Sequence, residues 1–548
     1  MIQTPSTEPG AGWVEATEVL GESTTVVAVL DLAAAEASDR VFLRTEDDQA
    51  TFGEAAFRAR RLAAGFAEIG VQPGDVVVLY MHNSVDMVLC TFALGYLGAA
   101  ASPVNVEYVG DLLTYVIDDT GATMAVVDAS LVPQFLQAAH LAREFEGGTV
   151  VIRVDEQVDG VDVGQFTSFD EIAASKAHLD VASTDQSSTL LIIYTGGTTG
   201  PSKGVIVTNG HALTFASDWT RCVAYTGEDI LYSCLPLFHG LAYLLGVLPT
   251  LLCRAQMIID RRFSASNFWS RVIEANATVA HSIFSMIPIL LAKPESELDR
   301  LHRLRAIYLG PSKYAPEFRE RFGVEVVEVY GQSETGVVTY APFGELPAGS
   351  CGRANPHFEI RIVDEMDNEV SVGHPGEIIV RPRLPFTMMR GYLSKDPETL
   401  DTFRNLWHHS GDRGFVDADG WYYYVDRMKD CIRRRGENIS SYEVEFVINQ
   451  YPRIVESAVF AVPADVEEDE VKACIVVDRA EEFDIGDFQE FLSTRLARFM
   501  RPRYVEIVDE LPKSAAQKVE KYKLIAAGVD GPTGITIDFD HPQNRLRR

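Results

Sequence analysis

Short, continuous runs of apolar residues alternate with segments of helical periodicity from about residue 25 to residue 425. The clearest runs occupy 76–81, 124–129, 190–195 and 304–310. Helical patterns follow at 85–97 and 131–144, a glycine-rich turn follows the third run, and a further helix is expected to begin near Pro316. Apolar runs with helices between them are typical of parallel strands that are buried on both faces. The pattern therefore predicts an α/β fold whose sheets are mostly parallel.

A second pattern begins after the aromatic-rich stretch at 383–427, where strands and turns are expected. Helices are predicted from near Ser441 and over 488–500, with strands at 458–463, 472–479 and 503–511. About a hundred residues of this α+β pattern suffice for a small second domain. Residues 1–24 are rich in Pro, Gly, Ser, Thr and Glu and are expected to form a flexible arm, and a polar tail is expected over 527–548.

The composition predicts a soluble protein of more than one domain, with 548 residues, 47% of them hydrophobic and 23% charged. The formal net charge of −31 disfavours nucleic acid and membranes as partners, because it repels phosphate backbones and anionic headgroups. The seven cysteines show neither CxxC pairs nor metal-ligand spacing, which favours reduced thiols in a cytoplasmic protein. No signal-peptide pattern is present, and the longest apolar stretch, Leu241–Cys253, is too short to span a bilayer.

The strongest local signal is TLLIIYTGGTTGPSKGV at 189–205, in which an apolar strand leads into a loop of glycine and hydroxyl residues. Glycines allow successive backbone N–H groups to converge on an anion, hydroxyls add donors, and a lysine adds positive charge. A Walker A loop is disfavoured, because Pro201 and Ser202 precede the lysine where that pattern requires Gly-Lys-Ser/Thr. The sequence therefore predicts a phosphate-binding loop made of Thr195, Gly196, Gly197, Thr198, Thr199, Gly200 and Lys203.

This loop and three further segments resemble the adenylate-forming superfamily of acyl-CoA synthetases, luciferases and peptide-synthetase adenylation domains. The further segments are VYGQSETG (329–336), HHSGDRGFVDADGWYYYVDRMKDCIRRRGENISSYEVE (408–445) and LPKSAAQKVEKYKL (511–524). They follow one another in the order that the family has, and the resemblance covers about residues 25–525. It implies a large adenylation domain of several subdomains at 25–428, joined at Asp426–Lys429 to a small mobile α+β catalytic domain at 429–526.

The resemblance implies a binding site for ATP. Tyr330 is expected to stack on adenine, Ser333 to contact phosphate, and Glu334 to hold Mg²⁺, for which a carboxylate oxygen is a suitable ligand. Asp412 and Arg427 match the positions that bind the ribose hydroxyls. The remaining expected nucleotide contacts are Gly331, Gly310, Pro311 and Ser312.

The resemblance also implies roles in the small domain. Lys518 is expected to stabilise charge in the first half-reaction, by bonding the acid carboxylate and the α-phosphate. Gln517 stands where many relatives have Gly, and Gly196 stands where many have Ser. Lys429 matches the hinge residue, which must change its backbone angles between two domain poses. Gly436 matches the glycine that lets the pantetheine arm of coenzyme A pass, and the arginines at 433–435 could meet coenzyme A phosphates.

A narrower resemblance concerns the acid. FHGLAYLLG (238–246), RFSASNFW (262–269) and FSMIPILLAKP (284–294) are similar to the crotonobetaine/carnitine–CoA ligase-like group. His239 matches the aromatic position that gates the acyl pocket and is expected to take part in catalysis. The other residues expected at the pocket are His281, Phe284, Leu309 and Gly310. Because Leu309 stands where relatives have glycine, its side chain should shorten the cavity and favour a small aromatic or polar acid.

The predicted reaction is attack of an acid on the α-phosphate of Mg·ATP with release of pyrophosphate, followed by transfer of the acyl group to coenzyme A. One alternative on the same fold is activation of nitrite for diazotisation of an aromatic amine. Two alternatives of other classes are a kinase-like or P-loop phosphotransferase and a non-catalytic nucleotide-binding protein. The joint presence of Lys203, Glu334, Asp412, Arg427 and Lys518 argues against the last. A homodimer is one assembly the chain could form.

Overall fold

The fold is given by a computed structural model of the chain. It describes residues 24–108, 110–156, 162–195, 202–283, 286–308, 314–427, 431–434, 437–463, 469–478, 483–496, 498, 500–514, 518–531 and 536–539. The expected arm at 1–24 therefore lies almost wholly outside the described residues.

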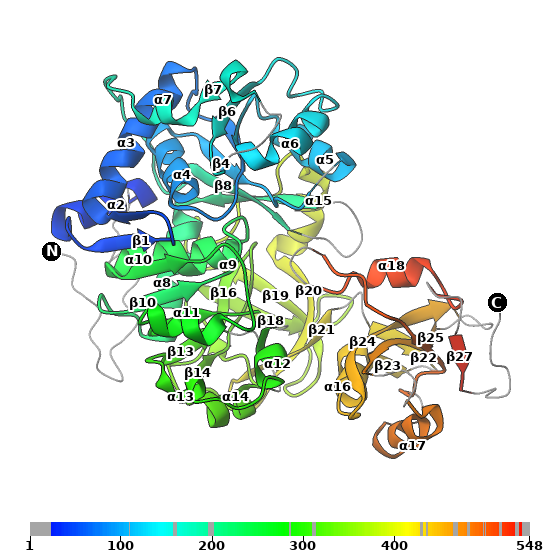
Figure 1. Ribbon diagram of the computed structural model, residues 1–548. Coiled ribbons are helices and arrows are strands. Elements are labelled where there is room, and N and C mark those ends of the chain that lie inside the picture. Colours follow the sequence, from blue (N-terminus) through cyan, green and yellow to red (C-terminus); the bar gives the residue numbers. More distant parts are fainter. Residues whose placement is uncertain are drawn as a thin grey trace.

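The first of two seven-stranded sheets contains three of the four predicted apolar runs (Figure 1). Its strands are ordered β7-β6-β5-β3-β4-β8-β9, and every neighbouring pair except β8 and β9 is parallel. The bounds are β3 (Val76–Tyr80), β4 (Ala100–Pro103), β5 (Met124–Asp128), β6 (Thr149–Arg153), β7 (Thr167–Ser168), β8 (Thr189–Thr195) and β9 (Lys203–Thr208). The prediction of mostly parallel strands in an α/β fold is confirmed.

Alternate residues of these strands pack into two different hydrophobic clusters. Val77 and Leu79 of β3 enter one cluster, whereas Val78 and Tyr80 enter the other. Because successive side chains of a strand point to opposite faces, both faces of the sheet must be covered by apolar groups. This arrangement explains why the strand appears in the sequence as a continuous apolar run rather than an alternating one.

Helices supply the covering layers on the two faces. The bounds in the first half of the chain are α2 (Val26–Glu36), α3 (Phe52–Glu68), α4 (Val85–Leu97), α5 (Gly110–Thr120), α6 (Val132–Ala139), α7 (Phe169–Ala173) and α8 (Asn209–Val223). Helix α4 has the predicted bounds, because Ser84 caps its N-terminus by accepting a bond from the Met87 N–H and Gly98 ends it at φ +69°. The helix predicted over 131–144 ends earlier, at Ala139, and Leu141 beyond it is 58% exposed.

The second seven-stranded sheet is ordered β14-β13-β12-β10-β11-β1-β2 and is parallel except between β1 and β2. Its strands are β1 (Val41–Arg44), β2 (Gln49–Thr51), β10 (Ile230–Ser233), β11 (Gln256–Ile259), β12 (Val279–His281), β13 (Ala306–Tyr308) and β14 (Glu325–Val327). The helical elements around it are α9 (Gly240–Ala242), η3 (Tyr243–Val247), α10 (Leu248–Cys253), α11 (Phe268–Glu274), α12 (Met286–Leu291), α13 (Leu298–Leu301) and α14 (Ala315–Phe322). The largest hydrophobic cluster contains residues of both sheets, such as Val77 and Leu231, so the two sheets share a core.

Two antiparallel sheets follow in the chain, and the strands expected in the aromatic-rich stretch at 383–427 are β20 and β21 of the second. One has the order β15-β16-β17, with β15 (Tyr330–Gln332), β16 (Gly336–Tyr340) and β17 (Arg353–Ala354). The other has the order β18-β19-β20-β21, with β18 (Phe358–Val363), β19 (Gly376–Pro382), β20 (His408–Val416) and β21 (Tyr422–Arg427). Helix α15 (Asp396–Thr402) lies between β19 and β20 in the chain.

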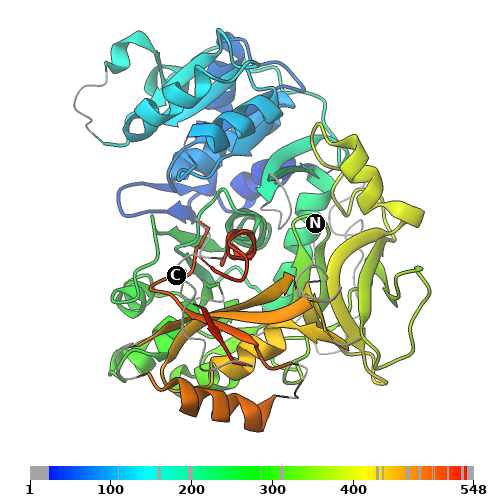
Figure 2. The same cartoon turned by 90° about the vertical axis from the view of Figure 1, so that its right-hand side faces the viewer.

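The C-terminal part forms a separate α+β unit beside the large region (Figures 1 and 2). Its elements are β22 (Cys431–Arg434), β23 (Glu437–Ser440), α16 (Ser441–Ile448), β24 (Ile454–Pro463), β25 (Asp469–Val477), α17 (Ile485–Arg495), β26 (Tyr504–Ile507), α18 (Lys521–Ala526) and β27 (Thr536–Asp538). Helix α17 begins three residues before the predicted helix, because the Asp484 carboxylate accepts bonds from the N–H groups of Gly486 and Asp487.

The segment expected as a polar tail contributes to this unit. Strand β27 pairs antiparallel with β26, and Asp538 forms an ion pair with Arg503 at 3.4 Å. Residues before β27 are tied to the core by the buried Lys472, whose Nζ donates to the carbonyls of Gly528 and Val529 and lies 2.8 Å from Glu506. The α+β unit thus continues past residue 526, to at least 539.

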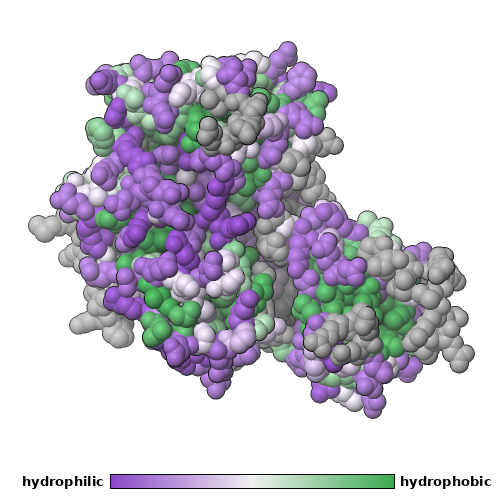
Figure 3. Space-filling model, in the orientation of Figure 1, coloured by the Kyte–Doolittle hydropathy of each residue, from purple (hydrophilic) through white to green (hydrophobic). Residues whose placement is uncertain are grey.

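Hydrophilic side chains cover most of the large region on the face shown in Figure 3, whereas hydrophobic side chains gather on the C-terminal unit. Within the part of the chain that the structure describes, no helix is both long and apolar enough to cross a membrane.

Candidate functional site

The ends of the expected phosphate-binding loop are held opposite each other by strands β8 and β9. Thr195 and Lys203 are partners in the antiparallel register of these strands. The hydroxyl group of Tyr115 donates to the backbone carbonyl of Ser202 at 2.8 Å, and the hydroxyl oxygens of Tyr108 and Ser202 are 3.4 Å apart. The end of the loop is therefore anchored to α5 and the segment before it. The loop residues Gly196, Gly197, Thr198, Thr199 and Gly200 lie outside the described residues.

Residues 330–336, here called the signature turn, comprise β15, the connection 333–335 and the first residue of β16. The backbone N–H of Gln332 donates to the Thr335 hydroxyl at 3.1 Å, and the Thr335 N–H donates back to the Gln332 carbonyl at 3.2 Å. A Cβ atom on Gly331 would lie 2.1 Å from the Gly336 carbonyl oxygen, so only glycine fits at this close backbone approach. The turn therefore presents Ser333 and Glu334 from a closely packed backbone.

Tyr392 brings Glu334 and Lys203 together. Its hydroxyl group donates to Glu334 Oε1 at 3.0 Å, and Lys203 Nζ lies 4.6 Å from the centroid of its ring. An ammonium group over the face of an aromatic ring is attracted by the ring quadrupole. Sequence reasoning did not identify Tyr392, because it lies almost 60 residues from Glu334 and almost 190 from Lys203, and a lone tyrosine after glycine carries no local signal.

Asp412 lies beside the signature turn and is 2% exposed. Its Oδ2 accepts bonds from the hydroxyl group of Tyr330 at 2.9 Å and from Gln332 Nε2 at 2.7 Å. Arg427 is the partner of Asp412 in the register of β20 and β21, although its side chain lies outside the described part. Three of the residues expected at the adenosine part of ATP, Tyr330, Asp412 and Arg427, therefore come from neighbouring strands.

Gln332 is a second residue that sequence reasoning did not identify. Its Nε2 also donates to the Ser410 carbonyl at 2.9 Å, and its Oε1 lies 3.1 Å from His408 Nε2. Burial and the Asp412 charge raise the pKa of Tyr330 well above its usual value, so its hydroxyl group stays protonated and donates. The signal that could have found Gln332 is its place inside the signature turn, between Tyr330 and Ser333.

His239 stands at the start of α9, next to the signature turn. A Cβ atom on Gly240 would lie 3.6 Å from Ser333 Oγ, so the Ser333 side chain lies close to the start of α9. Nε2 of His239 is buried and has no hydrogen-bond partner among the described residues. Burial, and to a smaller extent the positive charge of Lys518, lowers the pKa of His239 to about 4. The imidazole is therefore neutral at pH 7, and the exposed Lys518 of the C-terminal unit is near enough to act on it electrostatically.

His281 is another residue that the sequence predicts at the acyl pocket. Its side chain is fully buried, with Nδ1 3.2 Å from the Ser233 hydroxyl and Nε2 3.1 Å from the Leu245 carbonyl. Burial lowers its pKa to about 4, so the ring is neutral, donates from Nε2 to the carbonyl and accepts at Nδ1. The carbonyl belongs to the π-helix η3, a rare element that often occurs at functional sites. Both ring nitrogens of His281 thus have hydrogen-bond partners in the protein interior.

The loop of residues 235–239, here called the His239 loop, is fixed by Asn83. The Asn83 amide donates to the carbonyls of Leu235 at 2.9 Å and Asp260 at 3.0 Å, and its oxygen accepts from the Leu237 N–H at 2.8 Å. Asn83 follows β3 of the first sheet, whereas the His239 loop follows β10 of the second. One side chain therefore sets the position of the loop across the boundary between the sheets.

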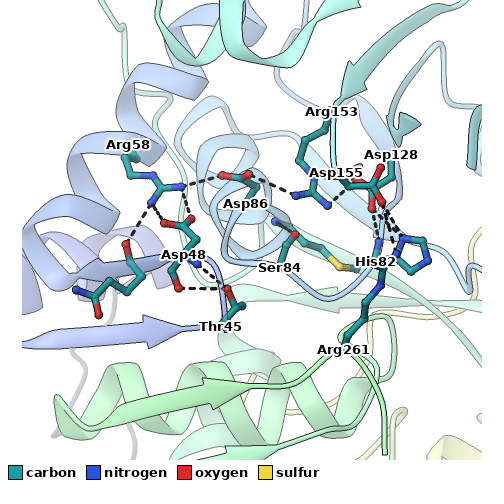
Figure 4. A network of polar contacts seen from close by, with 12 residues as sticks. Thr45, Asp48, Arg58, His82, Ser84, Asp86, Asp128, Arg153, Asp155 and Arg261 are labelled. Atoms are coloured by element: carbon teal, nitrogen blue, oxygen red, sulfur yellow. Dashed lines mark hydrogen bonds and ion pairs between the residues drawn. The ribbon is translucent and has the colours of Figure 1, made fainter. Parts of the chain in front are cut away.

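An ion network lies next to Asn83, at the carboxyl ends of β3, β5 and β6 (Figure 4). His82 Nδ1 is 3.1 Å from Asp128 Oδ2 and 3.6 Å from Asp155 Oδ2, and the three side chains are close enough to hold a metal ion. Arg153 already donates to Asp128 at 2.7 Å, and Arg261 lies 3.6 Å from Asp155. A divalent cation would have to displace these positive groups, so we interpret the cluster as an ion network and not as a metal centre.

His82 is the titratable centre of this network. Hydrogen bonds to Asp128 and Asp155 raise the pKa of His82 to about 8, and Asp155 has a pKa lowered by its bonds to His82 and Ser130 although burial opposes the shift. The protonated imidazole therefore joins the two carboxylates at neutral pH. Because Arg261 follows β11, the network also connects the first sheet to the second.

Seven other residues that the sequence predicts at the site lie outside the described residues: Phe284, Leu309, Gly310, Pro311, Ser312, Lys429 and Gly436. Arg434 has a buried guanidinium group that pairs with Glu470 at 2.6 Å and donates to the Arg501 carbonyl, so it serves packing inside the C-terminal unit.

Comparisons with known proteins agree with this geometry. Residues 30–393 match the family model of the AMP-binding enzymes, and residues 443–518 match that of the AMP-binding enzyme C-terminal domain. A crotonobetaine/carnitine–CoA ligase of Salmonella heidelberg (strain SL476) is 29% identical over 475 residues, which cover 85% of this chain and 90% of that protein.

Two solved structures are similar over almost their whole length. The anthranilate CoA ligase AuaEII, in complex with anthranoyl-AMP, has a TM-score of 0.84 at 23% identity, covering 94% of this chain and 99% of that one. ATP-bound MatB from Rhodopseudomonas palustris has a TM-score of 0.81 at 26% identity, covering 92% and 99%.

Proposed function

Because the chain belongs to the AMP-binding enzyme family, we propose that it is an AMP-forming acid–CoA ligase that activates a small carboxylic acid with ATP. In the first half-reaction, a carboxylate oxygen attacks the α-phosphorus of ATP, the bond between the α- and β-phosphates breaks, and pyrophosphate leaves. In the second, the thiol of coenzyme A attacks the carbonyl carbon of the acyl-adenylate, loses its proton, and AMP leaves.

The nucleotide is held by residues that meet at the signature turn. Lys203 and the loop 195–200 bind the phosphates, and Ser333 adds a hydroxyl donor. Asp412 and Arg427 bind the ribose, and Tyr330 lies under the adenine. The close packing of Asp412 with Tyr330 and of Glu334 with Tyr392 and Lys203 supports a single nucleotide site.

Glu334 is suited to Mg²⁺ by its chemistry and its place. Carboxylate oxygens are hard ligands, and Mg²⁺ in nucleotide enzymes is commonly held by one or two of them together with phosphate oxygens. Glu334 is also connected through Tyr392 to Lys203, a residue of the expected phosphate side. When bound, Mg²⁺ neutralises charge on the phosphates as pyrophosphate leaves.

Lys518 and His239 mark the position of the acid. Lys518 bonds the carboxylate and the α-phosphate oxygens as charge shifts between them, and such preorganised donors are a large source of catalysis. His239 is neutral and buried, so it borders the acyl pocket without adding a second positive charge. The single observation that carries the proposal is that Tyr392 contacts both Glu334 and Lys203, because it brings the signature turn and the end of the expected phosphate-binding loop into one site.

The second half-reaction requires a different pose of the small domain. Lys429 is the hinge, and rotation about it withdraws Lys518 and brings Gly436 to the path of the pantetheine arm. The acid is small and aromatic or polar, which is supported by the activities of the similar proteins: ligases of crotonobetaine or carnitine and of anthranilate. These activities favour a carboxylic acid over nitrite.

A pyrophosphate-release screen tests the proposal. The purified chain would be incubated with Mg·ATP and carnitine, crotonobetaine, anthranilate, benzoate or other small acids, or with nitrite and an aromatic amine, each with and without coenzyme A. We expect pyrophosphate and AMP with at least one small carboxylic acid, and a thioester by mass spectrometry only when coenzyme A is present. Production of ADP and a phosphorylated acid would overturn it, and so would a diazo product from nitrite and the aromatic amine with no activity toward any carboxylic acid.

A further inference from the structure

The segment of residues 389–393 connects the two parts of the nucleotide site through its backbone. On one side, the N–H groups of Arg390 and Leu393 donate to the Ile206 and Gly204 carbonyls at 3.0 and 2.8 Å, and the Ile206 N–H donates to the Gly391 carbonyl at 3.0 Å. On the other side, the Met389 N–H donates to the Glu334 carbonyl at 2.9 Å. The segment therefore bridges β9, which begins with Lys203, and the signature turn.

Tyr392 lies in the middle of this bridge and is held in one orientation. Its side chain is 7% exposed, and its backbone N–H donates to the Thr399 hydroxyl group at 2.9 Å. The hydroxyl group at the far end of the ring donates to Glu334 Oε1, while the ring face lies 4.6 Å from Lys203 Nζ. A single rigid side chain thus contacts a carboxylate and an ammonium group that the proposed reaction uses in different tasks.

We propose that Tyr392 is a positioning residue that sets the Mg²⁺-binding carboxylate of Glu334 and the phosphate-binding ammonium of Lys203 relative to each other. In this role Tyr392 does not itself contact the reacting atoms. The inference rests on the proposed function. The hydroxyl group limits rotation of the Glu334 carboxylate, and the ring face restrains the flexible lysine chain without removing its charge. Partners that orient a metal-binding carboxylate typically contribute ten- to a hundredfold to metal affinity.

The Tyr392→Phe variant isolates the first of these two effects, because it removes one oxygen and leaves the ring under Lys203. We expect the Mg²⁺ concentration for half-maximal pyrophosphate release to rise about tenfold, and activity to recover in excess Mg²⁺. Calorimetric titration of α,β-methylene-ATP at a series of Mg²⁺ concentrations gives a readout that does not depend on turnover. Its metal dependence is expected to shift by the same factor.

Tyr96 offers a matched control remote from the site. Its hydroxyl group donates to Asp31 Oδ1 at 2.5 Å, and the Arg60 guanidinium lies 4.5 Å from the centroid of its ring, so its environment copies that of Tyr392. Tyr96→Phe should lose thermal stability to a similar extent and keep the wild-type Mg²⁺ dependence. If both variants shift the Mg²⁺ dependence equally, the effect is general loosening and the proposal is overturned.

Tyr392→Leu tests the ring. This variant removes the cation–π contact as well, so binding of the nucleotide in EDTA should weaken several-fold, whereas Tyr392→Phe should bind like the wild type without metal. Tyr392→Leu also lacks the hydroxyl group, so if Tyr392→Phe does not fold, the same tenfold shift of the Mg²⁺ dependence is expected of Tyr392→Leu, and its absence would contradict the role.

Glu334→Gln separates this inference from the proposed function. If Glu334→Gln leaves the Mg²⁺ dependence of binding unchanged, the magnesium role of Glu334 in the proposed function fails. If Glu334→Gln shifts the dependence and Tyr392→Phe does not, only the positioning role of Tyr392 fails.

Discussion

Replacement of Asn83 by alanine should loosen the His239 loop without touching the nucleotide. Asn83 makes three hydrogen bonds to backbone groups, and the Leu237 N–H that it satisfies belongs to a residue that is only 1% exposed. A buried hydrogen bond contributes about 1 kcal/mol net, so losing the two that reach the loop, at Leu235 and Leu237, should lower the free energy of local opening by about 2 kcal/mol. This corresponds to roughly thirtyfold faster exchange of the amide protons in the loop, since 1.4 kcal/mol is about tenfold.

Hydrogen exchange read by mass spectrometry on peptides covering 234–239 measures this effect directly. Because His239 borders the proposed acid pocket, we also expect the KM for the acid to rise several-fold while the KM for ATP stays unchanged. Asn83→Asp keeps an acceptor for Leu237 but places a carboxylate against two carbonyl oxygens, so it should loosen the loop at least as much. Exchange within threefold of the wild type in Asn83→Ala would refute the reasoning, because it would mean that the bonds to Leu235 and Leu237 do not hold the loop.

Three further predictions concern other parts of the structure. The pKa of His82 is raised to about 8, so its ion pairs give stability that is fully present below the ordinary pKa near 6.5 and is lost as the pH rises through 8. Urea denaturation should therefore show that the wild type loses about 1 kcal/mol more than His82→Ala between pH 6.5 and 9, a value that allows for solvent screening. Lys518→Ala should slow pyrophosphate release by about a hundredfold or more, while calorimetry shows ATP binding within a few-fold of wild type. If the rate falls by less than tenfold, Lys518 has no catalytic role in the first half-reaction. Gly331→Ala places a Cβ atom 2.1 Å from the Gly336 carbonyl oxygen, so it should destabilise the signature turn by about 2–4 kcal/mol and abolish stabilisation by ATP in a thermal-shift assay. Wild-type behaviour would show that the turn can open without an energetic penalty.

The predictable parts of the fold are those in which neighbouring residues carry the signal. The run at 76–81 is apolar throughout because Val77 and Val78 face different clusters, and Ser84 and Gly98 set the ends of α4 through local hydrogen bonds and backbone angles. The end of the predicted helix at 131–144 was wrong, since nothing local distinguishes Ala139 from the positions after it. Strand β27 could not be predicted either, because its partner β26 lies some thirty residues away and its three residues are half-buried.

The same distinction between local and distant signals applies to the residues of the candidate site. Lys203, Glu334 and Asp412 lie in motifs that can be recognised from a few adjacent letters, and their roles remain predictions for experiment. Asn83 and Tyr392 lie in no such motif, and Gln332 lies in one that does not reveal its contacts. Their importance comes from contacts with residues about 58 to 190 positions away, as for Tyr392 and Lys203, and these contacts exist only once the sheets have packed.

The bridge formed by residues 389–393 has a consequence for solubility. Strand β9 is the last strand of its sheet, and an outermost strand offers unpaired N–H and carbonyl groups to any extended chain nearby. Three backbone bonds from this bridge occupy the outer side of β9, so the protein shields the border of its sheet with the same residues that organise its nucleotide site. Changes that detach the bridge would therefore threaten the molecule with edge-to-edge aggregation as well as with loss of activity.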